Sequence, residues 1–205
     1  MDFIEKFSGI FLIAGIFLFF LAIITLGIIP AYMVNKEDVP VGLPLAVPEE
    51  RQKDFASLEA YHDGLRLGRD IYIKEACWHC HSQFVRPTAN ENLRYGPIST
   101  PGESQNELNL PQLFGTRRVG PDLSREAGKK SDDWHYAHLY EPTSVVPQSV
   151  MPEYSWYFEL DSEGVPQPKP EAKALVAYLQ WLGSNVQNRQ ETVYDYQKVI
   201  LPPRE

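Results

Sequence analysis

Residues 75–87 read Glu-Ala-Cys-Trp-His-Cys-His-Ser-Gln-Phe-Val-Arg-Pro, and the five residues Cys77–His81 within them predict the fold of the surrounding domain. Cys-x-x-Cys-His is the pattern of covalent c-type haem attachment. Two thiols at this spacing can each reach a vinyl group on one edge of a porphyrin, and the next residue then brings its imidazole to the iron. We therefore expect one covalently bound haem c, attached through Cys77 and Cys80, with His81 as the proximal iron ligand.

Three other interpretations compete for the paired cysteines. A redox dithiol is expected beside alternating strands and helices, and the sequence shows no such alternation. A zinc site needs about four ligands, whereas Cys77 and Cys80 are the only cysteines in the chain. A chance match to a short pattern is the third. The single pair of cysteines, together with the long irregular segments that follow it, favours haem over all three.

A haem iron in a low-spin electron carrier needs a second axial ligand, and methionine is a common one because it raises the reduction potential. Of the three methionines, Met1 is the terminus and Met33 lies at the edge of an apolar segment, which leaves Met151. A methionine that only fills a gap in the core is the competing interpretation. His138 is the alternative ligand, on one face of a predicted short helix with His135.

The N-terminal segment predicts a membrane anchor. No charged side chain occurs from 7 to 35, and residues 9–29 are almost entirely apolar, which is enough helix to cross a hydrocarbon core of ~30 Å. We expect this helix to end near Pro30. A cleaved signal peptide is the alternative, but it would have a basic start and a shorter apolar stretch, whereas residues 2–6 are net acidic.

The chain divides into four predicted regions. These are a transmembrane anchor over 1–35, an extended proline-containing tether over 36–52, a mono-haem domain over 53–183 and a polar tail over 184–205.

Three helices are predicted in the domain, and no stretch alternates as a strand would. The first, over 53–76, has an apolar stripe at helical spacing that consists of Phe55, Leu58, Tyr61, Leu65, Gly68 and Tyr72. A short helix over 131–140 opens with Ser131 as its N-cap. The last, over 170–182, opens with a proline, with Leu175, Val176, Leu179 and Leu182 as its apolar face and Tyr178 and Trp181 flanking.

Between residues 86 and 121 the sequence is punctuated by proline and glycine, and no period survives. A long irregular segment is unusual in a compact domain unless it surrounds a bound group, and this segment therefore suggests a cofactor. The fold class is therefore mainly α, with long irregular loops. The formal net charge of −8 and the absence of any large basic cluster argue against nucleic-acid binding.

A series of further motifs accompanies the attachment pattern. Gln83–Pro87 follows it directly, then come Arg-Tyr-Gly at 94–96, Gly-Thr-Arg-Arg-Val-Gly-Pro-Asp-Leu at 115–123, Asp-Trp-His at 133–135 and Val-Pro-Gln-Ser-Val-Met-Pro at 146–152. In order and spacing this series closely resembles the mono-haem subunit of cbb3-type (C-family) haem-copper cytochrome c oxidases. The resemblance spans about 61–154, and the single N-terminal anchor is similar too.

The resemblance implies a class I cytochrome c-like domain in which Met151 is the axial partner of His81. It also implies that the carbonyl of Pro121 accepts the proximal imidazole N–H, which would orient the ring. By the same resemblance, the haem propionates would be neutralised by arginines, for which the candidates are Arg86, Arg94 and Arg118.

The resemblance further implies that the chain carries single electrons and holds no substrate-reducing site of its own. Its expected partners are membrane lipid, the catalytic haem-copper subunit that reduces oxygen, a di-haem cytochrome c subunit and a soluble cytochrome c donor. Because covalent haem attachment occurs outside the cytoplasm, we expect a single-pass protein of the bacterial inner membrane with a cytoplasmic N-terminus and a periplasmic haem domain.

Two other functions remain as alternatives at this point. The small cytochrome c subunit of nitric oxide reductase is also an N-terminally anchored mono-haem protein, but it lacks the 83–87 extension and the long 115–123 segment. A haem-based sensor module would need a labile Met151 and an output domain, and no such domain is recognisable in the sequence.

Overall fold

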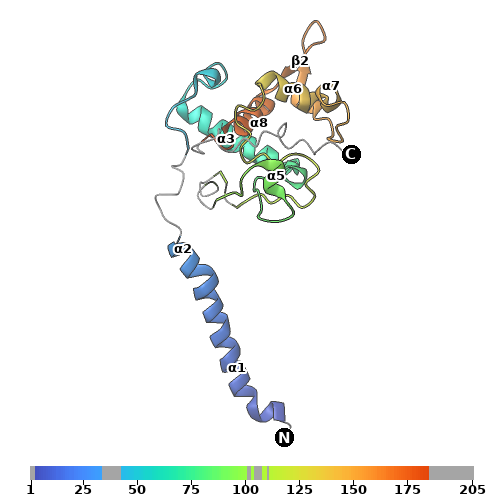
Figure 1. The fold of residues 1–205 in the computed structure, drawn as a ribbon. Coiled ribbons are helices and arrows are strands. Elements are labelled where there is room, and N and C mark those ends of the chain that lie inside the picture. Colours follow the sequence, from blue (N-terminus) through green and yellow to red (C-terminus); the bar gives the residue numbers. More distant parts are fainter. Residues whose placement is uncertain (1–2, 34–42, 101–102, 104–107, 110, 185–205) are drawn as a thin grey trace, which may run out of the picture. The chain divides into compact units, whose positions relative to one another are not determined.

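The structure is a computed structural model that describes residues 3–33, 43–100, 103, 108–109 and 111–184 (Figure 1). Its contacts divide the chain into two units, residues 1–39 and residues 40–205, which are described separately below. The predicted polar tail over 184–205 lies outside the described residues except for Ser184.

The first unit is one long apolar helix in three parts: α1 (Phe3–Ala22), the π-helical turn η1 (Ile23–Ile28) and α2 (Ile29–Met33). Its segment Lys6–Ile28 has a mean hydropathy of 2.8 and is long and apolar enough to cross a membrane. The prediction that the helix ends near Pro30 is wrong, because Pro30 lies within α2. A proline removes one N–H and crowds the preceding turn, and the wider π-helical turn directly before it accommodates that change.

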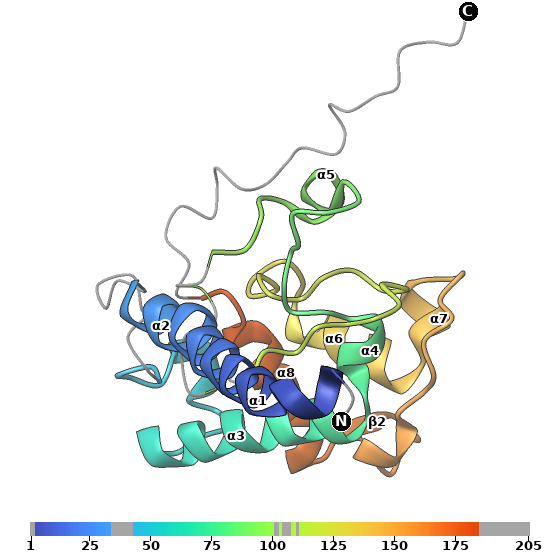
Figure 2. The same cartoon turned by 90° about the horizontal axis from the view of Figure 1, so that it is seen from below.

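The second unit is built around two helices, α3 (Leu58–Lys74) and α8 (Pro170–Trp181), which pack against each other (Figure 2). The prediction started the first helix at residue 53 and is wrong by five residues, because Ser57 caps the N-terminus by accepting the Ala60 N–H at 3.1 Å. The two helices come so close that a methyl group on Gly68 would lie 2.2 Å from the Ala174 carbonyl oxygen. Glycine at this crossing therefore permits a close approach of the two helix backbones that a larger residue would block.

Helix α8 is buried on nearly every side, and its buried residues include Tyr178 and Trp181, which the sequence placed beside the apolar face. A helix buried all round belongs to the centre of a domain. The apolar core of the domain accordingly consists of α8, the buried stripe of α3 and residues from the surrounding loops and short elements, including Leu108, Leu113, Leu139, Tyr154 and Phe158.

The remaining elements surround this pair. They are the 3-10 turns η3 (Glu49–Arg51) and η5 (Ser155–Tyr157), the short helices α4 (Cys77–Cys80), α5 (Glu91–Tyr95), α6 (Asp132–Tyr140) and α7 (Pro142–Val145), and the strands β1 (Phe158–Leu160) and β2 (Pro166–Pro168). Helix α6 confirms the predicted short helix, with Ser131 as its N-cap. The two strands form an antiparallel pair of three residues each, too short to produce the alternation by which a strand is recognised.

Residues 43–52, expected as part of an extended tether, contact the domain instead. Leu43 and Val47 pack against the core, and Arg51 is 3% exposed and forms an ion pair with Asp132 at the start of α6. The carbonyl of Pro44 lies 2.8 Å from a ring nitrogen of His62 in α3. Pro44 and Pro48 therefore belong to a segment that contacts the domain, and residues 36–42 of the expected tether lie outside the described residues.

Candidate haem-binding site

The two cysteines lie on α4, which is a single helical turn that follows directly on α3. Ala76, between the two helices, has a left-handed backbone (φ 56°), so the helical path of α3 is interrupted just before the cysteines. Both thiols are free and partly buried. Burial, the largest cause, raises the pKa of the Cys77 thiol to about 11. A redox-active dithiol needs a thiol with a lowered pKa, so this environment does not fit the dithiol interpretation.

His81 lies at the C-terminal end of α4, and its imidazole is held by the 115–123 segment. Its Nδ1 atom is 3.0 Å from the Pro121 carbonyl oxygen, 40 residues along the chain. A carbonyl only accepts, so Nδ1 carries the proton and Nε2 keeps its lone pair for a metal. Burial lowers the pKa of His81, against the opposing influence of Pro121 and Asp122. A neutral imidazole with this tautomer is the form that binds iron.

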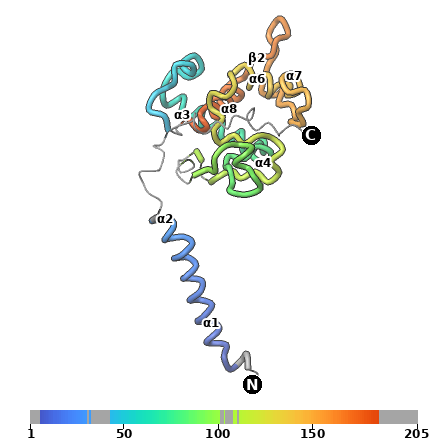
Figure 3. The backbone as a smooth tube through the Cα atoms, viewed as in Figure 1, coloured from blue at the N-terminus to red at the C-terminus, as the bar shows by residue number. Residues whose placement is uncertain are grey.

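The 115–123 segment lies along the attachment sequence and pairs with it through the backbone (Figure 3). The Arg117, Gly120 and Leu123 N–H groups donate to the carbonyls of His79, Cys80 and Ser82 at 3.3, 3.1 and 3.0 Å. Gly120 faces the imidazole so closely that a methyl group there would lie 2.2 Å from the ring of His81. Backbone hydrogen bonds and the absence of a side chain at Gly120 thus let the irregular loop pack directly against His81.

Two tyrosines of the helical core hold the other side of the attachment sequence. The Tyr72 hydroxyl, on α3, donates to the His81 carbonyl oxygen. The side-chain Nε2 of Gln83 donates to the Tyr178 hydroxyl of α8 at 3.0 Å, and that hydroxyl donates to the side-chain Oε1 of Gln83 at 3.1 Å. The sequence placed Tyr72 in the apolar stripe of its helix and Tyr178 beside the apolar face of the last helix, and predicted neither hydrogen bond. A helical period identifies the buried face of a helix and not the hydrogen bonds that its residues form.

Met151 lies in an irregular segment after α7. Its side chain is partly buried and packs against the same apolar core as Cys77. Three residues later, Tyr154 places its hydroxyl beside the Cys77 thiol, while its N–H donates to the Leu139 carbonyl at 2.8 Å. The methionine segment is therefore brought to the attachment helix, although it is 70 residues away in sequence.

The histidines that compete for the iron have distinct environments. His62 contacts the Pro44 carbonyl, and the exposed His79 stacks on Trp78 with ring centroids 3.9 Å apart. His135 is buried beside Glu126, at 3.9 Å. His138 stacks on Trp134, and its Nδ1 is buried without a hydrogen-bond partner in the described part of the chain. Burial, the largest cause, and the charge of His81 lower the pKa of His138, so the two imidazoles lie close enough to interact electrostatically.

The three arginines expected near the propionates differ in their partners. Arg86 forms an ion pair with Glu91, and Arg118 forms ion pairs with both Glu91 and Asp122. Arg94 is exposed, and its guanidinium lies 5.0 Å from the centroid of the Tyr95 ring. In the described residues, Arg94 alone of the three has no ion pair with a carboxylate.

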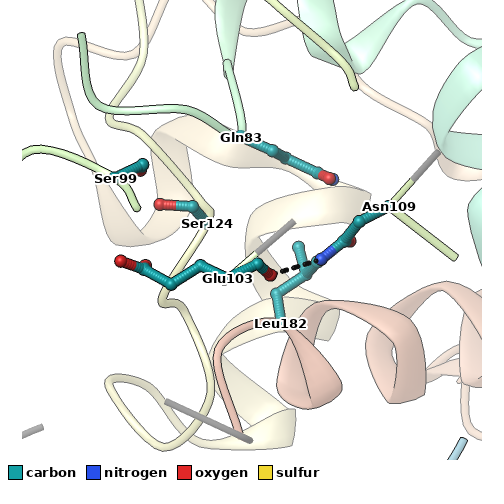
Figure 4. A pocket seen from close by; sticks show the side chains of 6 residues that line it. All are labelled: Gln83, Ser99, Glu103, Asn109, Ser124 and Leu182. Carbon is teal, nitrogen blue, oxygen red and sulfur yellow. Dashed lines mark hydrogen bonds between the residues drawn. The ribbon is translucent and has the colours of Figure 1, made fainter. Parts of the chain in front are cut away.

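A small polar pocket lies beside this site. It has a volume of about 10 Å³, enough for one water molecule, and is lined by Gln83, Ser99, Glu103, Asn109, Ser124 and Leu182 (Figure 4). A larger surface groove of about 550 Å³ runs beside α6 and the two strands. Neither of these two pockets is lined by the cysteines, His81 or Met151.

The residues fit a haem c. Two thiols on one helical turn, a neutral imidazole whose second nitrogen is oriented by a carbonyl, and a thioether from a distant segment are the donor set of a six-coordinate haem iron. When bound, this group would supply one-electron transfer between the ferric and ferrous states. The apolar neighbours of Cys77 and Met151 would exclude water from the iron.

Together with the paired cysteines and the oriented imidazole of His81, the fold is that of a mainly α-helical, cytochrome c-like protein with an N-terminal helix of membrane-spanning length. The sequence matches the family model described as cytochrome C oxidase, mono-heme subunit/FixO over residues 3–170. The chain therefore belongs to the FixO family of mono-haem cytochrome c oxidase subunits, and the resemblance expected from the motif series is confirmed. A search of curated proteins gave no match.

Proposed function

We propose that this subunit is the electron carrier of a cbb3-type oxidase, with haem c attached through Cys77 and Cys80 and its iron held between His81 and Met151. The observation that carries the proposal is the hydrogen bond between His81 Nδ1 and the Pro121 carbonyl, within a motif that already supplies both thiols. A histidine with its Nδ1 bonded in this way keeps its Nε2 for a metal.

The roles of the surrounding residues follow from their contacts. Pro121 fixes the tautomer and the orientation of the His81 ring, and Gly120 leaves room for it. Tyr72 and the Gln83–Tyr178 pair fix the attachment sequence to the helical core, so the ligand moves little when the charge on the metal changes. A site that needs little reorganisation suits a protein that only passes electrons.

In the complex, electrons would arrive from a soluble cytochrome c or a di-haem sister subunit and leave for the catalytic subunit, where oxygen is reduced. The family supports membership of an oxidase complex. The N-terminal helix would place the domain permanently at the surface of the catalytic subunit, which replaces a diffusive encounter. We place the domain in the periplasm and the N-terminus in the cytoplasm, because haem c is attached outside the cytoplasm.

Met151→Leu tests the proposal in the full chain purified with its partner subunits. Haem should stay attached through the cysteines, while the low-spin ferric spectrum and oxygen-dependent turnover are lost. His138→Asn is the matched control and should leave both unchanged. If the low-spin spectrum survives Met151→Leu but not His138→Asn, the imidazole of His138 is the ligand and the assignment of Met151 is wrong.

A further inference from the structure

An ionic cluster lies beside the segment that carries Pro121, and it is buried except for Arg86, whose side chain is 39% exposed. It consists of Arg86, Glu91, Arg118 and Asp122, two cations and two carboxylates, and is called the Arg118 cluster below. Glu91 and Asp122 are each 4% exposed, and the Arg118 side chain is 8% exposed. Charges removed from water to this extent are stable only when paired and hydrogen-bonded, so the geometry of the cluster is strongly constrained.

Arg118 is the centre of the cluster. Its Nη1 donates to Asp122 Oδ2 at 2.6 Å, and its Nη2 donates to the Glu91 carboxylate and to the Phe84 carbonyl oxygen. Asp122 Oδ2 also accepts the Phe84 N–H at 3.0 Å. One guanidinium thus connects the segment after the haem-attachment motif to both ends of the short loop 118–122.

That loop contains Gly120 and Pro121, the two residues in direct contact with the imidazole of His81. Arg118 itself has a left-handed backbone, with φ 52°. A non-glycine residue in this conformation is strained, and such strain persists where surrounding contacts fix it. The side-chain bonds of Arg118 are contacts of that kind.

We propose that Arg118 is a positioning residue for the proximal histidine: its planar guanidinium holds the loop 118–122 so that the Pro121 carbonyl meets His81 Nδ1. This inference rests on the proposed haem site. It gives Arg118 a different role from the propionate partner that the family resemblance implied. Arginine suits the task because its rigid fork can donate in fixed directions to two carboxylates and a carbonyl, which a lysine ammonium on a flexible stem cannot do.

Arg118→Lys is the primary test, because it keeps the positive charge and removes the fork. The full chain is purified with its partner subunits, the reduction potential of this haem is titrated spectroscopically, and pulsed electron–nuclear double resonance measures the exchangeable Nδ1 proton of His81. A weaker bond to Pro121 makes the imidazole a weaker donor to ferric iron. We therefore expect a higher reduction potential and a changed Nδ1 proton coupling.

The double variant Arg118→Gln with Glu91→Gln removes one charge of each sign and provides a second test if the lysine variant does not fold. Like Arg118→Lys, it should raise the reduction potential of the haem. If Arg118 acted only by neutralising a propionate, Arg118→Lys would keep that charge and the potential would not rise. An unchanged or lower potential in the lysine variant, with a wild-type Nδ1 signal, overturns the proposal.

Arg125 offers a matched control elsewhere in the loops. It is 7% exposed and donates twice to Glu103 and once to the Pro97 carbonyl, each at 2.8 Å. Within the described residues it has no hydrogen bond or ion pair with the 118–122 loop. Arg125→Lys should lower the melting temperature by about as much as Arg118→Lys does. It should leave the reduction potential of the haem and the Nδ1 signal of His81 unchanged. An equal rise in potential in this control would also overturn the proposal, because the effect would then reflect general loosening.

Failure of this inference and failure of the proposed function give different results. If the wild-type subunit carries no covalent haem, the proposed function fails. If the wild type carries haem with His81 as a ligand and Arg118→Lys leaves the haem signals unchanged, the proposed function stands and the positioning role fails.

Discussion

The helical pair α3–α8 and the 115–123 loop both approach the haem-attachment sequence, but they are stabilised in different ways. The helices pack through apolar side chains, with Leu65, Leu175 and Val176 all nearly inaccessible to solvent. The loop is held by backbone hydrogen bonds and by the Arg118 cluster. The comparison indicates that burial of apolar area fixes the scaffold of this domain, whereas directional polar bonds fix the position of the candidate ligand.

One glycine in each region makes the comparison concrete. Gly68 lies where α3 crosses α8, and Gly120 lies against the imidazole of His81. Each site leaves no room for even a methyl group, at 2.2 Å from the nearest atom in both cases. Alanine at the first position should therefore damage the scaffold, and alanine at the second should damage the ligand geometry.

Gly68→Ala should have the largest effect on stability. The new methyl group would overlap a backbone carbonyl of α8, so the helices must separate, at a cost of about 3 kcal/mol. Thermal unfolding of the full chain in detergent measures this loss of stability. Gly64→Ala is the control, since its methyl group meets only the ring of Phe55, which can move, and the change should stay within about 1 kcal/mol. Equal losses in the two variants would contradict the tight crossing.

Gly120→Ala should affect ligation more than stability. We expect a loss of about 2 kcal/mol in the loop, covalent haem at wild-type levels and a perturbed low-spin ferric signal, because the methyl group displaces the His81 ring. Electron paramagnetic resonance measures the ligand field. A wild-type signal from this variant would show that the contact between Gly120 and His81 does not constrain the iron.

His135 makes the stability of the helical region depend on pH. Burial, the largest cause, lowers the pKa of this histidine from 6.5 to about 4. The unfolded chain therefore binds a proton at higher pH than the folded one, and stability falls as the pH drops from about 6.5 toward 4. We expect a loss of about 2 kcal/mol at about pH 5, which His135→Asn should largely remove. A variant that keeps the full wild-type loss would assign the pH dependence to other groups.

Ser131→Ala should have the smallest effect. The serine hydroxyl accepts the Trp134 N–H at 3.2 Å at the start of α6, and loss of such a cap costs about 1 kcal/mol. Ser131→Asp retains a capping oxygen and should keep wild-type stability. Thermal unfolding of the two variants side by side separates the cap from other consequences of replacing the serine.

The sequence predicted the scaffold well, because helical periodicity and end signals are local. The apolar stripe of α3, the cap of α6 and the proline that opens α8 all appear in the structure. The errors have local causes too. The Ser57 cap was overlooked, a π-helical turn carries the first helix past Pro30, and two three-residue strands are too short to show a period.

The loop region could be predicted only where a motif or a family resemblance identified a residue. The approach of Pro121 to His81 was expected on that basis, and the structure has the hydrogen bond. The ion pairs of Arg118 with Glu91 and Asp122 were not foreseen, since they join residues 27 and 4 positions apart in a stretch without any period. A loop conformation that is fixed by such ion pairs produces no periodic pattern in the sequence.

The most direct measurement is the haem content of the full chain, produced in a host that matures c-type cytochromes. A pyridine haemochrome spectrum together with the mass of the denatured polypeptide should show one haem per chain, joined by two thioether bonds, at Cys77 and Cys80. A colourless polypeptide of unmodified mass from such a host would contradict the covalent attachment of haem at Cys77 and Cys80.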